Sequence, residues 1–342
     1  MLQAERLSEK AQAPSFFNRL LRRVDGCEVE VRFDDKADAD RVTIDDVAHS
    51  ARERLPLFSG DEAVHGRVLL TPTGSSYHYN GVVIALVGYL STFTPEESRK
   101  EFVRQETSFG ANTIDRPSLL DFHFGALKKH ESYRGIAARV TYCVQVTVQR
   151  PVKNVTQRAE VWVTNVDEAL TAQQPDASAH RSYFRETEFG PDSVAMDVGV
   201  DNRLHIEFTY DKQLFHLTER VLGKVTFKLA EMDLEFGEFG VVRKEFLMQD
   251  GVEDNYEAET LQKFEIMDGT PIVGEVVPLR LYLGSVPRLT PTYVGIEQRL
   301  TVRYFLNLVL VTSAGKRYFK QQEIVLYRRR GQERPACLPT PS

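Results

Sequence analysis

Residues 302–310 read Val-Arg-Tyr-Phe-Leu-Asn-Leu-Val-Leu, and residues 140–148 read Val-Thr-Tyr-Cys-Val-Gln-Val-Thr-Val. The two stretches align without a gap. Each begins with valine, carries tyrosine at its third position and then places an apolar residue at every second position. Such alternation is typical of a β-strand with one buried face. A chain that contains the same strand signature twice is a candidate for a duplicated domain.

A second pair of stretches has nearly the same separation. Residues 62–70 (Glu-Ala-Val-His-Gly-Arg-Val-Leu-Leu) parallel residues 219–227 (Glu-Arg-Val-Leu-Gly-Lys-Val-Thr-Phe), and in both a glycine precedes a basic residue. Two matches at one spacing indicate two copies of one β-rich unit. Coincidence is the competing interpretation, because β-branched residues recur in every all-β protein.

Length and composition restrict the class of protein. A chain of 342 residues normally forms two domains, each able to bury its own core. The net charge of −6 gives no reason to expect nucleic-acid binding, which usually needs a basic surface. The three cysteines are widely separated, so neither a disulfide framework nor a zinc site of paired cysteines is supported, and a reducing compartment is favoured.

The rest of the chain is consistent with β-structure. Residues 27–34 and 204–210 alternate apolar and polar side chains, and residues 82–87 form a continuous apolar run suited to a strand buried on both faces. Helical periodicity is weak outside residues 15–24 and 95–104. The pattern predicts an all-β protein made of antiparallel β-sandwiches.

Composition also suggests where the domains begin and end. The stretch 167–192 is polar and has the composition of a linker or surface insertion, and the proline-rich C-terminal end is expected to be disordered. The predicted division is an N-terminal arm (1–25), a first sandwich (26–166), a linker or insertion (167–192), a second sandwich (193–330) and a tail (331–342).

The sequence contains no recognised catalytic motif, such as a phosphate-binding glycine loop or a nucleophile elbow. The best metal candidate is His205 with Glu207, which lie two apart on a predicted strand and therefore on one face. A solvent-facing strand explains this pair equally well, because zinc sites need three or four converging ligands. A binding protein without cofactor or metal is therefore expected, with an enzyme built on β-sandwiches as the minor alternative.

The C-terminal half resembles a known family. Residues 265–269 (Glu-Ile-Met-Asp-Gly) and 318–324 (Tyr-Phe-Lys-Gln-Gln-Glu-Ile) are distinctive, and residues 302–310 fall between them. Together they resemble the arrestin-like subunit of retromer, the endosomal coat complex, in the vacuolar protein sorting-associated protein twenty-six family. The likeness covers about residues 26–330. It implies an arrestin-like fold of two antiparallel β-sandwiches and a non-enzymatic adaptor on the cytosolic face of endosomes, for retrieval to the Golgi and the cell surface.

In this family the C-terminal sandwich binds an α-helical solenoid subunit through one loop. By motif match, the contact residues here are Ile266, Met267, Asp268 and Gly269. An exposed isoleucine and methionine on a turn would be a suitable apolar anchor for a helical groove. The alternative is that Ile266 and Met267 are core residues at the end of a strand.

The family also captures sorting signals in the cytoplasmic tails of membrane cargo, together with a sorting nexin, and contacts the membrane indirectly. By motif match, Val198 and Phe319 would line the pocket for an apolar cargo side chain, although both could be ordinary strand residues. An arrestin-type adaptor of another endosomal complex is the alternative function.

The chain departs from the family pattern in three places. Its N-terminal arm is longer, and residues 169–190 look like an insertion. Ser59 and Gly60 stand where relatives that bind a nexin with a PDZ domain have an acidic contact, which puts that partnership in doubt.

Overall fold

The structure is a computed structural model, and it describes residues 22–24, 26–34, 36, 41–46, 51–93, 97–127, 130–166, 193–200, 203–249 and 252–329. These residues form β-strands and one short 3-10 helix (Leu283–Ser285). Within these ranges, no helix is long and apolar enough to cross a membrane. The expected all-β architecture of antiparallel sheets is confirmed.

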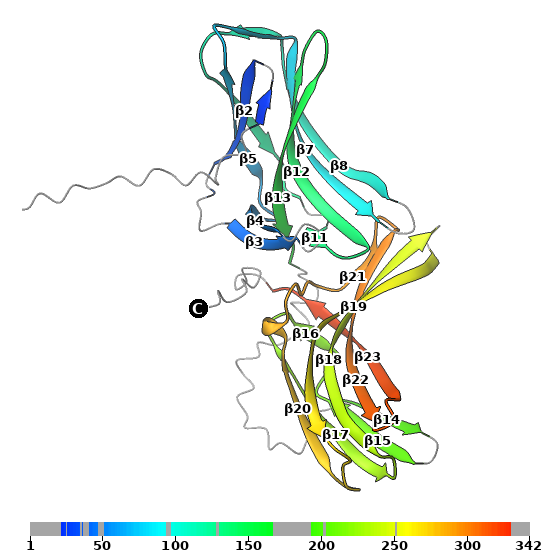
Figure 1. The fold of residues 1–342 in the computed structure, drawn as a ribbon. Helices are drawn as coiled ribbons and strands as arrows, with labels where there is room; N and C mark the ends of the chain where they lie inside the picture. The colour runs from blue at the N-terminus through cyan, green and yellow to red at the C-terminus, as the bar shows by residue number, and fades with distance from the viewer. Residues whose placement is uncertain are drawn as a thin grey trace, which may run out of the picture.

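The first sandwich packs a four-stranded sheet against a seven-stranded sheet (Figure 1). The smaller sheet has the order β1 (Arg22–Val24), β2 (Cys27–Phe33), β5 (Val64–Pro72), β10 (Ser118–Phe124). The larger sheet has the order β3 (Arg41–Asp46), β4 (Ala51–Ser59), β13 (Val155–Thr164), β12 (Ala138–Gln149), β7 (Gly81–Thr92), β8 (Ser98–Phe109), with β11 (Tyr133–Arg134) paired to β12. A short ribbon of β6 (Tyr77–Tyr79) and β9 (Asn112–Ile114) lies at one end.

The second sandwich has the same plan. Its four-stranded sheet has the order β14 (Val194–Val200), β15 (Leu204–Tyr210), β17 (Arg220–Ala230), β20 (Val276–Tyr282). Its six-stranded sheet has the order β16 (Leu214–His216), β23 (Arg317–Tyr327), β22 (Leu300–Thr312), β18 (Leu234–Gln249), β19 (Val252–Asp268), with β21 (Tyr293–Ile296) paired to β22.

The two strand orders correspond strand for strand, as expected for a duplication, except that β3 and the β6–β9 ribbon have no counterpart among the described strands of the second sandwich. The corresponding strands include the one parallel pair that each sandwich shows within the described ranges, β4 with β13 and β16 with β23. The repeated signatures fall on equivalent strands, β12 and β22 for the first pair and β5 and β17 for the second.

The repeated tyrosine makes the same contact in both copies. Tyr142 is buried, and its hydroxyl accepts from the backbone N–H of His130 at 3.3 Å. Tyr304 is also buried, and its hydroxyl accepts from the backbone N–H of Thr290 at 3.1 Å. Each hydroxyl therefore fixes the segment that leads into its own strand, which satisfies the polar end of a buried aromatic side chain.

The repeated glycine is required by a close backbone approach. A Cβ added to Gly66 would lie 2.2 Å from the carbonyl oxygen of Arg32, and one added to Gly223 would lie 2.8 Å from that of Thr209. Any side chain at either position would push the adjacent strand away.

Both helical expectations need correction. Residues 98–104 belong to β8, and residues 22–24 form β1 at the edge of the first sheet. The remainder of the 15–24 segment lies outside the described residues, as do the linker or insertion at 167–192 and the tail at 331–342. The proposed domain boundaries therefore remain a prediction.

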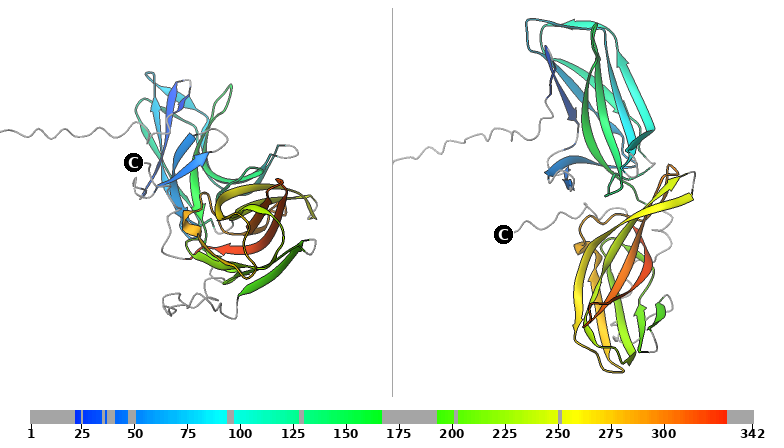
Figure 2. Two further views of the ribbon diagram at one scale, coloured as in Figure 1. Left: turned by 60° about the horizontal axis from the view of Figure 1, so that its bottom comes forward. Right: turned by 45° about the vertical axis from the view of Figure 1, so that its right-hand side comes forward.

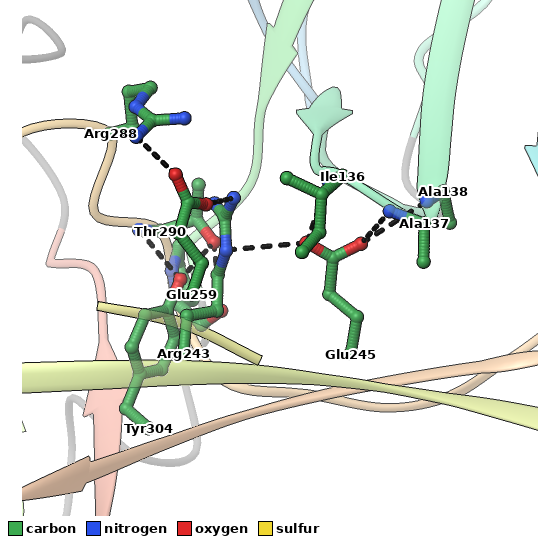
Figure 3. A network of polar contacts seen from close by, with 10 residues as sticks. Ile136, Ala137, Ala138, Arg243, Glu245, Glu259, Arg288, Thr290 and Tyr304 are labelled. Carbon is green, nitrogen blue, oxygen red and sulfur yellow. Dashed lines mark hydrogen bonds and ion pairs between the residues drawn. The ribbon is translucent and has the colours of Figure 1, made fainter. Parts of the chain in front are cut away.

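The two sandwiches lie end to end, and side chains of the second hold one segment of the first (Figures 1 and 2). The Glu245 carboxylate reaches from β18 and accepts backbone N–H groups of Ile136, Ala137 and Ala138 at 3.0, 2.9 and 3.1 Å (Figure 3). Glu245 is 1% exposed, so the three donors replace the water that this charge has lost.

Charged side chains on both sides complete this joint. Arg243 is fully buried beside Glu245 and donates to Glu259 at 2.6 Å. Arg328, directly after β23, donates to both oxygens of the buried Glu131 in the first sandwich, at 2.9 and 3.2 Å. Because each buried charge has a partner, removing one of them would leave the other uncompensated.

Candidate partner-binding site

All of the predicted partner-binding residues lie at one end of the second sandwich. Strands β14 and β19 end there and β23 begins there, as their pairing shows. The turn Glu231–Asp233 links β17 to β18 and so joins the two sheets at this end. Arg328 and the joint lie at the opposite end. The end that carries the predicted partner-binding residues therefore faces away from the first sandwich, and we call it the distal end (Figure 1).

Ile266 and Met267 are the two residues before the last residue of β19. The expectation that they lie on an exposed turn is therefore wrong. Both are half-buried and pack against the core of the sandwich. Glu238 pairs with Glu265 and Gly237 pairs with Met267, so Ile266 is the extra residue of a β-bulge. A bulge interrupts the alternation of side chains along a strand. Two consecutive apolar residues can therefore contact the same core.

The next residues form a tight turn. Gly269 has a φ of +79°, which favours glycine, and its N–H donates to the Glu235 carbonyl at 2.7 Å. The backbone N–H of Leu234 donates to the Thr270 hydroxyl oxygen at 2.9 Å. These bonds tie the start of the turn to the start of β18.

Two apolar side chains between β19 and β20, Ile272 and Val273, are exposed at this end, with exposed fractions of 75% and 62%. They follow Pro271, between Gly269 and Gly274. The motif match did not include them. The sequence did contain a signal for them, an Ile-Val pair between two turn glycines. Side chains in such a turn are usually exposed to solvent, so an apolar pair there indicates a binding surface.

Val198 and Phe319 lie on different sheets and face different ways. Val198, on β14, is half-buried and packs against the core. Phe319, on β23, is 71% exposed and lies opposite Val309 on the outer face of the six-stranded sheet. The structure brings both residues to the distal end but does not place them in one cavity.

Two open strand edges accompany these residues. Within the described part of the chain, β14 pairs only with β15 and is an edge of its sheet. Strand β16 pairs only with residues 325–327 of β23, so, among the described residues, residues 317–324 have a strand on one side only. Neither edge contains proline, whereas the edge strand β20 contains Pro278. An extended peptide can add to an open edge through main-chain hydrogen bonds.

The two side chains considered for metal binding, His205 and Glu207, each interact with another charged side chain. His205 Nε2 lies 2.9 Å from Asp197 Oδ1, and Glu207 pairs with Lys228. Across the described ranges, no cluster of three or more His, Cys, Asp or Glu side chains is arranged to hold a metal ion.

Comparison with known proteins gives consistent matches. The family model described as vacuolar protein sorting-associated protein 26 matches residues 24–315. The chain is 34% identical to vacuolar protein sorting-associated protein 26 of Dictyostelium discoideum, over 89% of this chain and 82% of that protein. It is 32% identical to the Schizosaccharomyces pombe protein of the same name, over 82% and 88%, and 33% identical to the Arabidopsis thaliana protein 26B, over 88% and 94%.

Proposed function

The chain belongs to the vacuolar protein sorting-associated protein 26 family, and from this premise we propose that it is the arrestin-like adaptor subunit of retromer. Membership itself gives a role in vacuolar and endosomal protein sorting, in a family that is not known for enzymes. The proposed adaptor binds the α-solenoid subunit and helps to capture cargo tails. It acts on the cytosolic face of endosomes, and its membrane contact is indirect.

The observation that carries the proposal is the structure around the motif Ile266-Met267-Asp268-Gly269. The bulge leaves two apolar residues half-exposed at the end of an edge strand, and the turn that follows presents Ile272 and Val273. Apolar side chains on a rigid support can bind a groove between helices with little loss of conformational entropy.

The test replaces both bulge residues, Ile266→Asp with Met267→Asn. Charge and amide groups cannot be buried against an apolar groove without several kcal/mol of cost, so we expect binding of the retromer α-solenoid subunit to be abolished. Binding is measured by isothermal titration calorimetry with purified subunits. Because the residues are only half-buried, the variant should still show the β-rich circular dichroism of the parent chain.

Val152→Asp is the matched control. Val152 is 95% exposed and lies on the β12–β13 turn of the first sandwich, so this variant adds a charge far from the distal end. It should bind the solenoid like the parent chain. A folded double variant that keeps full affinity would contradict the docking assignment.

A cargo role for Val198 and Phe319 is supported by comparison of the two copies. Phe319 lies opposite Val309, and Val309 corresponds to Thr147 in the repeated signature. Thr147 lies opposite Thr156, so the first copy has a threonine where the second has Phe319. Val198 lies two strands away from Phe227, across β15. The residue that corresponds to Phe227 in the first copy is Leu70, and the residue two strands away from it, across β2, is Arg22. The fold therefore does not require an apolar residue at either position, and a binding role explains both.

The alternative is an arrestin-type adaptor of another endosomal trafficking complex. The two functions differ in the proteins that accompany the chain in cells. Mass spectrometry of proteins that co-purify at near-physiological salt would recover the retromer solenoid and a sorting nexin under the first proposal, and neither under the alternative.

A further inference from the structure

The residue opposite Met267 in the sheet is a buried glycine, Gly237. A Cβ added to Gly237 would lie 2.7 Å from Cγ and 3.2 Å from Sδ of Met267, and 3.2 Å from Cδ2 of Leu310. Contacts under 3.0 Å essentially do not occur for real Cβ atoms. The side chain of Met267 therefore occupies the space where any other residue at position 237 would have its Cβ.

Gly237 also lies at the bulge. The register shifts between Gly237 and Glu238, and this shift releases Ile266 from pairing. Bulges re-aim the side chains next to them and are often found beside functional sites. One short segment of β18 thus determines where Ile266 and Met267 lie. We call these two residues, which are proposed to bind the solenoid, the docking surface.

The first copy shows that the fold needs neither feature. The position equivalent to Gly237 is Val82, which pairs with Phe109 on β8. There the pairing continues without a shift through Val83 with Ser108 and Ile84 with Thr107. A valine fits the ordinary register of this sheet, so the glycine and the bulge are specific to the copy that carries the docking motif.

We propose that Gly237 is the positioning residue of the docking surface: it leaves room for Met267 to lie across β18, and thereby sets the position that Met267 and the bulged Ile266 present to the solenoid. This inference rests on the proposed docking function. Gly237 makes no contact with the partner and acts through Met267.

The test is a double-mutant cycle between Gly237→Ala and Met267→Ala, with the retromer α-solenoid subunit as the probe in titration calorimetry. Each single variant should weaken binding at least tenfold. Gly237→Ala displaces the Met267 side chain, and Met267→Ala removes it. In the double variant the displaced atoms are absent, so its affinity should equal that of Met267→Ala within about twofold.

Gly284→Ala is the matched control for adding a methyl group. Gly284 lies in the short 3-10 helix at the other end of the sandwich, and a Cβ there would meet Thr218 only at 3.6 Å, an ordinary contact. This variant should bind like the parent chain, and the melting temperatures of all variants report their folding.

Each outcome has a defined meaning. Additive losses in the double variant, or no loss in Gly237→Ala, would overturn the positioning role. If Gly237→Ala unfolds, restoration of folding by Met267→Ala, with the affinity of that single variant, supports the role, and failure to restore folding overturns it. Full binding by Met267→Ala, and by the Ile266→Asp/Met267→Asn variant above, would instead refute the docking function itself.

Discussion

Asp211 is a partly buried carboxyl group directly after β15. Its Oδ1 accepts the backbone N–H of Leu222 at 3.1 Å. Burial raises the pKa of Asp211 from 3.8 to about 6, although the hydrogen bond from Leu222 opposes this shift. Between about pH 4 and 6, the Asp211 carboxyl is therefore protonated in the folded chain and ionised in the unfolded chain. The stability that Asp211 contributes is highest below this window and is lost as pH rises through it.

We predict that Asp211→Asn stabilises the protein at pH 7. The amide keeps an oxygen that can accept from Leu222 and removes the buried charge, which costs at most about 3 kcal/mol for a shift of this size. The gain in melting temperature, measured by differential scanning calorimetry, should shrink as pH falls from 7.5 toward 5. An equal gain at every pH would show that ionisation of Asp211 is not the cause.

At the residue scale, the sequence predicts what depends on local pattern and misses what depends on pairing. Tyr142 with Tyr304 and Gly66 with Gly223 were recognisable as pairs, because each serves its own copy of the strand in the same way. The sequence left burial of Ile266 at a strand end only as the alternative to exposure on a turn, because it follows from a register shift opposite a glycine that lies far away along the chain.

At the scale of elements, the open edges at the distal end predict how a cargo peptide would bind. Phe319 projects from the outer face beside the unpaired edge of β23, so an extended peptide added there would gain main-chain hydrogen bonds and one aromatic contact.

We predict that Phe319→Ser weakens binding of a hydrophobic sorting-signal peptide by roughly 5- to 30-fold, because an aromatic contact of this kind contributes about 1–2 kcal/mol. Fluorescence anisotropy with the nexin and the solenoid present would measure it. Solenoid affinity should be unchanged, because Phe319 lies on β23 and the docking motif on β19. Unchanged peptide binding would exclude Phe319 from the cargo site.

Strand β8 shows why some elements were misjudged. Residues 95–104 have helical periodicity, yet residues 98–104 pair with the apolar strand β7. Partners in the sheet and burial against neighbours override such a local pattern. Strands with strict alternation, such as β2 and β15, were predictable because one face of each is covered by the core.

At the scale of the whole molecule, the joint holds the two sandwiches in one orientation. Glu245 lies 1% exposed and receives three N–H donors from residues 136–138 (Figure 3). We predict that Glu245→Ala destabilises the protein by about 3 kcal/mol, because it leaves these donors and part of the Arg243 charge unsatisfied. Calorimetry should then resolve two transitions, and X-ray scattering should give a larger radius of gyration.

Glu257→Gln is the control for the joint. Glu257 lies directly opposite Glu245 on the neighbouring strand β19 but is exposed. Its replacement should leave one transition and the parent radius. Parent-like behaviour of Glu245→Ala would mean that the linkage between the sandwiches depends on other contacts, such as Glu131 with Arg328.

Strand β23 has a practical consequence for labelling. Phe319 lies on its open edge and Arg328 follows it at the joint, and the nine steps between them span about 30 Å at the usual rise of a strand. A fluorophore attached beyond Arg328 therefore starts on the side of the sandwich opposite the docking surface. Paired with an acceptor dye on the solenoid, it would report assembly by energy transfer while leaving both binding edges unmodified.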